Sequence, residues 1–274
     1  MATEYFLGHR GYSELYPENT MLAFKEAVEA GACGFELDVV KSADGVLFIM
    51  HDDTVDRTTD GTGKCSELTW DYIKTLDAGS YKDSAFAGVG VPSLEQVLVY
   101  FKRKICWILI EIKDGYNDIA TEVAEMITAR KMENQVKVQS FNWDYMDTVK
   151  SMNPDICTGL LGTFSPTAQA RALKGGHKFL SISSYTKQAI NSAHKYGFDT
   201  FIWTENTADG IQHYIDLNVD GIIGNDIELF TNAATANSIN QCYPYTKAAL
   251  PALYTRKYKR AMVKLIRNAA GEWI

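Results

Sequence analysis

The stretch GFELDVVKSADGVLFIMHD, residues 34–52, decides the fold class. It contains two strand-like runs, 34–40 and 46–52, separated only by KSADG. A parallel pair of strands needs a crossover of a dozen residues or more, so these two runs are predicted to form an antiparallel hairpin. The second run is therefore left out when the strands of a parallel sheet are counted.

Strand-like apolar runs alternate with helical stretches along most of the chain. Continuous apolar strands between helices are typical of a parallel sheet buried on both faces. Outside the hairpin the runs are 5–9, 107–113, 136–141, 156–161, 178–184, 199–204 and 220–225. The expected helices start at Asn19 and end before Gly31, and then cover 94–102, 117–130, 143–152, 166–174, 186–196 and 207–217. With the first hairpin strand this gives eight βα units, which predicts an α/β TIM barrel, (β/α)8.

Two segments do not follow the βα alternation. Residues 53–92 are rich in Gly, Asp and Thr, with a short helix expected at 69–76, and are too long for an ordinary βα loop. Because they follow the second strand's hairpin, we interpret them as a small insertion that caps the mouth of the barrel. The predicted domains are a barrel over 1–234 and a C-terminal extension over 235–274.

The C-terminal extension differs from the barrel in charge. The whole chain has a net charge of −7, and residues 235–274 carry seven Lys and Arg against Glu272, or +6, which leaves −13 for residues 1–234. So acidic a body is a poor nucleic-acid binder. Within the extension, residues 252–270 are predicted to form a basic amphipathic helix. Three interpretations stay open: docking on the acidic body, a homo-oligomer interface, or weak contact with an anionic membrane surface.

Composition limits the class of protein. A chain of 274 residues with 46% hydrophobic content suits one large globular domain or two small ones. No apolar run reaches the length of a spanning helix, and the first residues, MATEYFLGHRG, lack the regions of a signal peptide. The five cysteines have no metal-type spacing and are interpreted as reduced thiols. We therefore expect a cytoplasmic protein.

Charged residues are concentrated at the predicted strand ends, where TIM barrels place their active sites. The first strand ends at His9-Arg10, and the second carries Glu36 and Asp38. The other ends hold Glu111, Lys113, Trp203 and Asn225-Asp226. Alternation along a strand places Glu36 and Asp38 on the same face of the second strand. It likewise places Glu111 and Lys113 on the same face of their strand. These charges cannot point at the packed helices, so they are expected to point into the barrel mouth.

Three converging carboxylates repel one another, so either their pKa values rise or a cation lies among them. Such hard oxygen ligands suit Mg²⁺ or Ca²⁺. The alternative is a buried salt-bridge network of the carboxylates with Arg10 and Lys113. The sequence therefore predicts one divalent cation bound by Glu36, Asp38 and Glu111.

The hairpin is expected to bring a second histidine to the site. If Asp44-Gly45 form a two-residue turn, Ala43 pairs with Val46, and Asp38 lies opposite His51. A shift of one residue would instead place Glu36 opposite His51. Two histidines suit a general base and a general acid near neutral pH. Arg, Lys and a divalent metal stabilise charge on a phosphoryl oxygen.

Several residues keep a structural alternative. The stretch PENT, residues 17–20, either simply starts the first helix, with Asn19 as its N-cap, or has a role near the site. Trp203 is either barrel core or an aromatic wall for the substrate, and the sequence does not decide the roles of Gln139 and Phe141. A structural or solvated role is expected for His177, His194 and His213.

The motifs resemble the glycerophosphodiester phosphodiesterase family. The match, in the family's order over about residues 5–230, consists of HRG (9–11), PENT (17–20), GFELDV (34–39), DG (44–45), HDDTVDRTTDGTG (51–63), PSLEQVL (92–98), EIK (111–113), SF (140–141), IWTEN (202–206) and DGIIGND (220–226). The chain differs from the family pattern at Asn225-Asp226, where a Thr-Asp is common, and at Glu205, where an apolar residue is common.

The resemblance implies a TIM barrel with a small insertion and divalent-metal-dependent hydrolysis of a glycerophosphodiester to glycerol 3-phosphate and an alcohol. It also implies roles by position: His9 and His51 as the catalytic pair, Glu36, Asp38 and Glu111 as metal ligands, and Arg10 and Lys113 as phosphate binders. Alternatives of other classes are a phosphodiester lyase similar to sphingomyelinase D, a hydrolase of a glycerophosphate polymer such as teichoic acid, and a non-enzymatic binding module.

Overall fold

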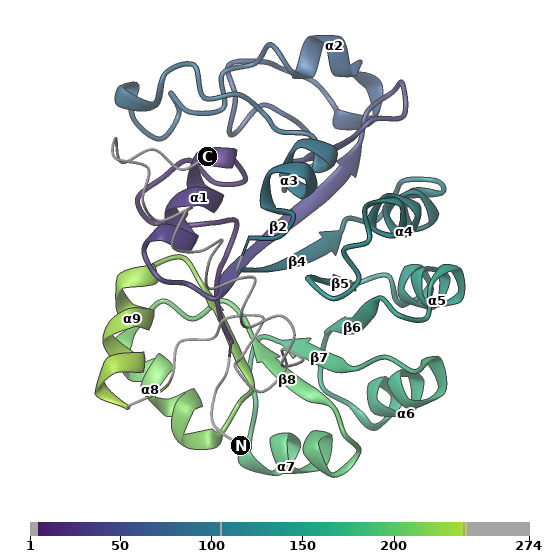
Figure 1. Ribbon diagram of the computed structural model, residues 1–274, viewed down its shortest axis with the longest axis vertical. Coiled ribbons are helices and arrows are strands. Elements are labelled where there is room, and N and C mark those ends of the chain that lie inside the picture. Colours follow the sequence, from purple (N-terminus) through teal and green to yellow (C-terminus); the bar gives the residue numbers. More distant parts are fainter. Residues whose placement is uncertain (1–4, 105, 238, 240–274) are drawn as a thin grey trace, which may run out of the picture.

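The computed structural model describes residues 5–104, 106–237 and 239. Eight parallel strands form a closed barrel surrounded by helices, which confirms the predicted TIM barrel (Figure 1). Around the barrel the strands follow the order β1-β9-β8-β7-β6-β5-β4-β2, and pairing of β1 with β2 closes it. The strands of the described chain are β1 (Tyr5–Gly8), β2 (Gly34–Lys41), β3 (Leu47–Ile49), β4 (Trp107–Ile112), β5 (Val136–Ser140), β6 (Cys157–Gly162), β7 (Phe179–Ile182), β8 (Asp199–Ile202) and β9 (Gly221–Gly224).

Most of the described helices begin where a polar side chain caps them. Thr20, Ser93 and Ser165, for example, each accept a hydrogen bond from a backbone N–H in the first turn of their helices. The α-helices of the described residues are α1 (Met21–Glu29), α2 (Trp70–Ile73), α3 (Leu94–Phe101), α4 (Ile119–Arg130), α5 (Trp143–Met152), α6 (Pro166–Gly175), α7 (Lys187–Lys195), α8 (Ala208–Leu217) and α9 (Ile227–Ala236). Helix α9, capped by Asp226, is absent from the helices that the sequence predicted.

The N-cap of α1 is Thr20, so the interpretation in which Asn19 caps this helix is wrong. The Thr20 hydroxyl accepts a hydrogen bond from the backbone N–H of Ala23, at 3.2 Å. Asn19 instead has a positive φ of 57° and turns its side chain toward β2. Asn is one of the few residues other than Gly that adopt this conformation readily.

Strand β3 is antiparallel to β2, as the short linker predicted, but its register differs from the predicted one. Val39 lies opposite Ile49, and the Met50 N–H donates to the Asp38 carbonyl at 3.1 Å. Asp38 therefore faces Met50, not His51, and neither proposed register is correct. The turn has three residues, closed by a hydrogen bond from Ser42 N–H to the Val46 carbonyl, with Gly45 at φ 86°. A type I turn followed by a left-handed residue has this form.

The insertion lies between β3 and α3 and contacts the segment that follows β1. In Figure 1 it is the blue lobe beside the far end of β2. Besides α2, it contains the 3-10 turns Cys65–Glu67 and Ser84–Phe86, so the predicted helix at 69–76 is shorter than expected. The Lys82 ammonium donates to the Ser13 carbonyl at 2.8 Å, and the ring of Phe86 packs on Tyr16. The insertion is thus attached to the mouth of the first βα unit.

Aromatic side chains fill the layer between the strands and the helices. Phe24 of α1 stacks on Phe35 of β2, with ring centroids 4.4 Å apart, and Phe35 also contacts Phe101 of α3. All three are buried. This packing fixes α1 and α3 against β2, the strand that carries two of the predicted site residues.

The cysteines depart in part from the prediction. Cys65, Cys106 and Cys157 are free thiols, whereas Cys33 is disulfide-bonded, so the expectation that all five are reduced is wrong.

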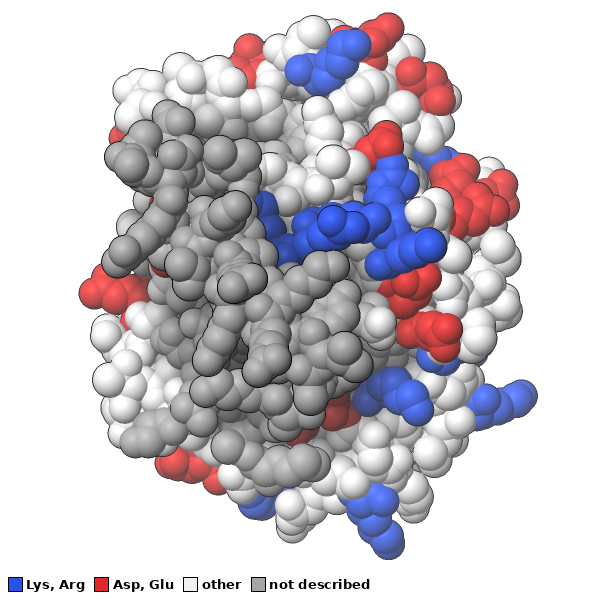
Figure 2. All heavy atoms as spheres, in the orientation of Figure 1, with Lys and Arg blue, Asp and Glu red and all other residues white. Residues whose placement is uncertain are grey.

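The surface carries both signs of charge. Figure 2 shows a band of Lys and Arg side chains on the face that it presents, with Asp and Glu side chains beside the band. The net acidic charge of residues 1–234 is therefore not spread evenly. Among the described residues, no helix is both long enough and apolar enough to cross a membrane. The predicted C-terminal helix, residues 252–270, lies outside the described residues.

Candidate active site

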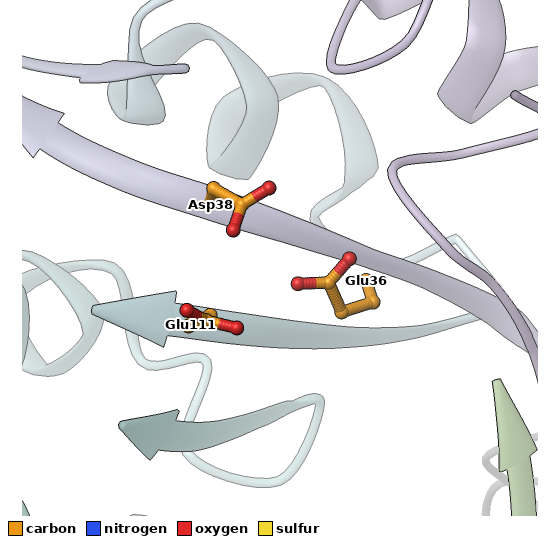
Figure 3. A group of neighbouring side chains, drawn as sticks. All are labelled: Glu36, Asp38 and Glu111. Carbon is orange, nitrogen blue, oxygen red and sulfur yellow. The ribbon is translucent and has the colours of Figure 1, made fainter. Parts of the chain in front are cut away.

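Three carboxylates meet inside the barrel mouth, as predicted. Strand β2 places Glu36 and Asp38 on its inner face, and its parallel pairing with β4 puts Asp38 beside Glu111. One carboxylate oxygen from each residue lies within 4.8 Å of the other two (Figure 3). All three residues are at least nine-tenths buried. Buried carboxylates at such short range need compensating positive charge.

The pKa values of the cluster show how incomplete this compensation is. Burial raises the pKa of Glu36 well above its ordinary value, and the charges of Asp38 and Glu111 add to this shift. Burial, followed by the charge of Asp38, raises the pKa of Glu111 to about 7. The set of oxygen donors and its shortage of positive charge both fit a hard divalent cation.

Two cations lie against this cluster and supply part of the missing charge. The Lys113 ammonium lies 2.9 Å from Glu111 Oε1 and 3.5 Å from Asp38 Oδ1. The Arg10 Nε lies 3.6 Å from Asp38 Oδ2, too far for a hydrogen bond, and has no hydrogen-bond partner among the described residues. Both predicted phosphate binders thus reach the site, and in this state they pair with carboxylates.

The conformation of the His-Arg-Gly turn explains how Arg10 reaches the cluster. Arg10 has a φ of 56°, and its backbone N–H donates to Glu36 Oε2 at 3.0 Å. Gly11 has a φ of 86°, and a Cβ at this position would lie 2.6 Å from the backbone of Ala23. Only glycine satisfies both conditions, so the turn packs directly on α1.

His9 is held at the end of β1 by the last barrel strand. Its backbone N–H donates to the Gly224 carbonyl, and its ring Nδ1 lies 2.8 Å from Asn225 Oδ1. Because an amide oxygen only accepts, Nδ1 donates this bond and Nε2 is left as an acceptor. Burial, followed by the charge of Arg10, lowers the pKa of His9 to about 4. His9 is thus a neutral imidazole at pH 7.

His51 lies two residues after β3, and the carboxylate of Asp52 orients its ring. Its Nδ1 lies 2.7 Å from Asp52 Oδ1, and the side chain is one-third exposed. His51 also lines a small cavity together with Glu18 and Asn19. The predicted second histidine therefore lies beside the segment that leads from β1 to α1, although the register that was used to place it is wrong.

Two residues of the motif PENT connect these groups, and their contacts are not evident from the sequence. The Asn19 amide donates to Asp38 Oδ2 at 2.8 Å, and the Glu18 carboxylate accepts a 2.7 Å hydrogen bond from Arg10. The Asn19 amide is thereby a further neutral partner of the carboxylate cluster. Asn19 therefore lies beside the cluster, and its role in the reaction stays a prediction.

Comparison with known proteins gives one family. The model of the glycerophosphoryl diester phosphodiesterase family matches residues 9–229. A glycerophosphodiester phosphodiesterase of Caldanaerobacter subterraneus subsp. tengcongensis is 36% identical over 232 residues, which are 82% of this chain and 96% of the relative. The chain belongs to the glycerophosphoryl diester phosphodiesterase family. It is thereby an enzyme of the phosphodiesterase class.

Solved structures agree with the fold. A glycerophosphodiester phosphodiesterase from Agrobacterium tumefaciens superposes with a TM-score of 0.75 at 29% identity, over 84% of this chain and 100% of the other. A phosphodiesterase from Oleispira antarctica, solved with the product sn-glycerol-3-phosphate, gives a TM-score of 0.78 at 23% identity, over 85% and 97% of the two chains. The family barrel therefore accounts for the closed sheet described above.

The two departures from the family pattern have different consequences in the structure. Asn225 contacts the catalytic candidate His9, as described above, so it belongs to the site. The Glu205 carboxylate instead accepts hydrogen bonds from the backbone N–H and the hydroxyl of Thr207, two residues further along the same loop. Glu205 thus has a local structural role.

Aromatic residues lie at the ends of β5 and β8. Trp203 stands edge-to-face with Phe141, with ring centroids 5.8 Å apart. The Phe141 side chain is half exposed, and Trp203 Nε1 is buried without a hydrogen-bond partner among the described residues. The remaining histidines lie in local contacts: His177 with Thr158 and Asp147, His194 with Asp220, and His213 against the ring of Tyr214.

Proposed function

We propose that this chain hydrolyses a glycerophosphodiester to glycerol 3-phosphate and an alcohol, in a reaction that depends on a divalent cation. The observation that supports this most strongly is the buried cluster of Glu36, Asp38 and Glu111, beside Arg10 and Lys113, in a chain of the phosphodiesterase family. The site thus combines oxygen ligands for a hard cation with two fixed positive charges. A phosphodiester needs both, because negative charge accumulates on its oxygens in the transition state.

The carboxylate cluster is the proposed cation site. A bound Mg²⁺ or Ca²⁺ would polarise a phosphoryl oxygen and offset its charge. Arg10 and Lys113 add positive charge at the same end of the barrel, where they would hold the non-bridging oxygens of the substrate. The Trp203 ring, beside the half-exposed Phe141, is proposed as an aromatic wall against the substrate.

The two histidines are proposed to carry the protons, with different roles. His9 is buried and neutral and has Nε2 free to accept, so it suits the general base. His51 is paired with Asp52, which compensates the positive ring that a general acid must carry. His51 would give its proton to the leaving alcohol, and His9 would take one from the attacking hydroxyl or water. Whether the glycerol 2-hydroxyl attacks first, giving a cyclic intermediate, or water attacks directly stays open.

Turnover of glycerophosphocholine tests the proposal. Release of glycerol 3-phosphate is followed with a coupled dehydrogenase, and phosphorus NMR separates this product from a cyclic phosphate. A stable cyclic product would instead favour a lyase similar to sphingomyelinase D, which the family match does not favour. Absence of turnover on every member of a panel would contradict the proposal. The panel holds glycerophosphocholine, glycerophosphoethanolamine, glycerophosphoglycerol, lysophospholipid and teichoic acid.

The insertion at 53–92 is proposed to select the head group, because the strand ends provide the shared chemistry. Its contacts with Ser13 and Tyr16, a few residues after the His-Arg-Gly turn, support this role. Shortening the loop around 80–90 is expected to change the order of preference across the same panel. An unchanged order would contradict the role of the insertion without affecting the proposed reaction.

A further inference from the structure

One arginine of the insertion bridges two carboxylates beside the proposed catalytic groups. The Arg57 Nε donates to Asp52 Oδ2 at 2.6 Å, and its Nη2 donates to Asp52 Oδ1 at 3.1 Å. The same guanidinium donates from Nη1 and Nη2 to the two oxygens of Glu18, at 2.9 and 2.8 Å. Both carboxylates are therefore held in bidentate geometry by one planar group, which fixes their orientation as well as their position.

Each of these carboxylates has a second partner that belongs to the proposed mechanism. The oxygen of Asp52 that Nη2 contacts lies 2.7 Å from His51 Nδ1. The oxygen of Glu18 that Nη2 contacts also accepts from Arg10 Nη1, at 2.7 Å. Arg57 is thus linked through Asp52 to His51, the proposed general acid, and through Glu18 to Arg10, a proposed phosphate binder.

The charges of this network are fixed at neutral pH. Burial opposes ionisation of Glu18, but hydrogen bonds from Arg57 and the charge of Arg10 outweigh it and lower the pKa of Glu18 to about 2. Hydrogen bonds from Arg57, the largest cause, hold the pKa of Asp52 well below its usual range. Both carboxylates therefore stay ionised at neutral pH, the form in which they accept all the hydrogen bonds from Arg57.

The network has little value as a stabiliser of the fold, which separates the two roles that Arg57 could have. The Arg57 side chain is 46% exposed, and exposed ion pairs add little to stability. Other contacts also hold the insertion to the barrel: Lys82 donates to the Ser13 carbonyl, and the Tyr81 hydroxyl accepts a hydrogen bond from the Glu18 N–H. Loss of Arg57 is therefore expected to leave the protein folded.

We propose that Arg57 is a positioning residue of the reaction, which fixes the imidazole of His51 through Asp52 and the guanidinium of Arg10 through Glu18. This inference rests on the proposed function. It makes the insertion part of the active site, because a residue within 53–92 then determines how His51 and Arg10, two groups proposed to act on the substrate, are held. Small misplacements of catalytic groups cost large factors in rate.

The test compares Arg57→Met with a matched control, Arg171→Met. Arg171 also bridges two carboxylates, Asp144 and Asp147, but it lies on α6, where none of the proposed site residues is found. We expect kcat on glycerophosphocholine to fall about tenfold to a hundredfold for Arg57→Met and to stay unchanged for the control. The melting temperatures of the two variants should stay similar. A kcat within about twofold of wild type for Arg57→Met would overturn the inference.

A double-mutant cycle separates positioning from a structural effect. If Arg57 acts through Asp52, the variant Arg57→Met with Asp52→Asn should be no slower than Asp52→Asn alone, when both are measured in a Glu18→Gln background that has already lost the branch to Arg10. Independent, multiplying losses in kcat would overturn the proposal. Should Arg57→Met fail to fold, Arg57→Lys decides: a single ammonium cannot bind both carboxylates in bidentate form, so a lower kcat in a folded protein is expected, and a wild-type kcat overturns the proposal. If wild type itself turns over no glycerophosphodiester, the proposed function fails first.

Discussion

Burial of His9 makes a quantitative prediction about stability in acid. Its pKa in the folded protein is about 4, against an ordinary value of 6.5, chiefly because the ring is buried. The unfolded chain therefore binds more protons than the folded one between these values, and stability is lost as the pH falls through 6.5 toward 4. Linkage gives a loss of about 2 kcal/mol between pH 8 and pH 5 from this residue alone.

The assay is urea unfolding in EDTA, at pH 8 and pH 5, of wild type and His9→Asn. The variant removes the titrating ring, so its loss of unfolding free energy between the two pH values should be smaller than that of wild type by about 2 kcal/mol. His213→Asn is the matched control, because His213 is exposed and lies outside the site, and it should behave as wild type. Equal pH dependence in wild type and His9→Asn would refute the reasoning, since His9 would then titrate alike in both states.

Three further predictions follow from the burial of charged groups and from the place of the site. Saturation of wild type with Mg²⁺ or Ca²⁺ at about 100 times its Kd should add about 2.7 kcal/mol of stability, or about 5–10 °C in melting temperature. Glu36→Gln should lose this gain but be no less stable in EDTA, because it removes one of the repelling charges; an undiminished gain in scanning fluorimetry would contradict the cation site. Lys137 is buried among aromatic rings of the barrel, and its Nζ lies 5.0 Å from the ring centroid of Trp107 and 5.1 Å from that of Tyr5. Lys137→Met keeps most of the side-chain volume and should keep the unfolding free energy within about 1 kcal/mol, whereas Lys137→Ala leaves a cavity and should lower it by about 2–4 kcal/mol. Removal of residues 238–274 should leave turnover of soluble glycerophosphocholine unchanged, because every proposed site residue lies before Asp226, and a lost kcat in a folded protein would show that the extension takes part.

The fold was predictable because parallel strands buried on both faces leave a strong pattern. Each barrel strand is a short apolar run, and the charged residues at its end stand out against that run, as Glu111 in β4 and Lys113 directly after it do. The hairpin was also predictable, since five residues cannot make a crossover. Helix α9 was overlooked although Asp226 and Glu228 carry an N-terminal signal that could have identified it.

The register of the hairpin could not be decided from the sequence. Asp44-Gly45 suits a two-residue turn, and Gly45 equally suits the left-handed position of a three-residue turn. The structure adopts the second, in which the Ser42 hydroxyl accepts from the Val46 N–H and the Asp44 carboxylate accepts from the Trp70 N–H. This last contact comes from the insertion, so the choice of turn depends on a residue that is distant in sequence.

The residues that surround the proposed catalytic groups were not predictable for the same reason. Asn225 binds His9 across 216 positions, and Arg57 binds Glu18 across 39. No periodicity or spacing records such contacts. The strand alternation identified the groups that point into the mouth, but the side chains that orient them come from loops whose conformation depends on the whole fold.

The account is tested most directly by turnover of glycerophosphocholine before and after removal of divalent cations, followed by phosphorus NMR. We expect glycerol 3-phosphate to form with wild type, to stop forming in EDTA, and to form again when Mg²⁺ or Ca²⁺ is restored. His9→Ala and His51→Ala, measured in the same way, should each lower kcat by about 10²–10⁴. Full turnover in a cation-free preparation, or by either histidine variant, would contradict the proposed site.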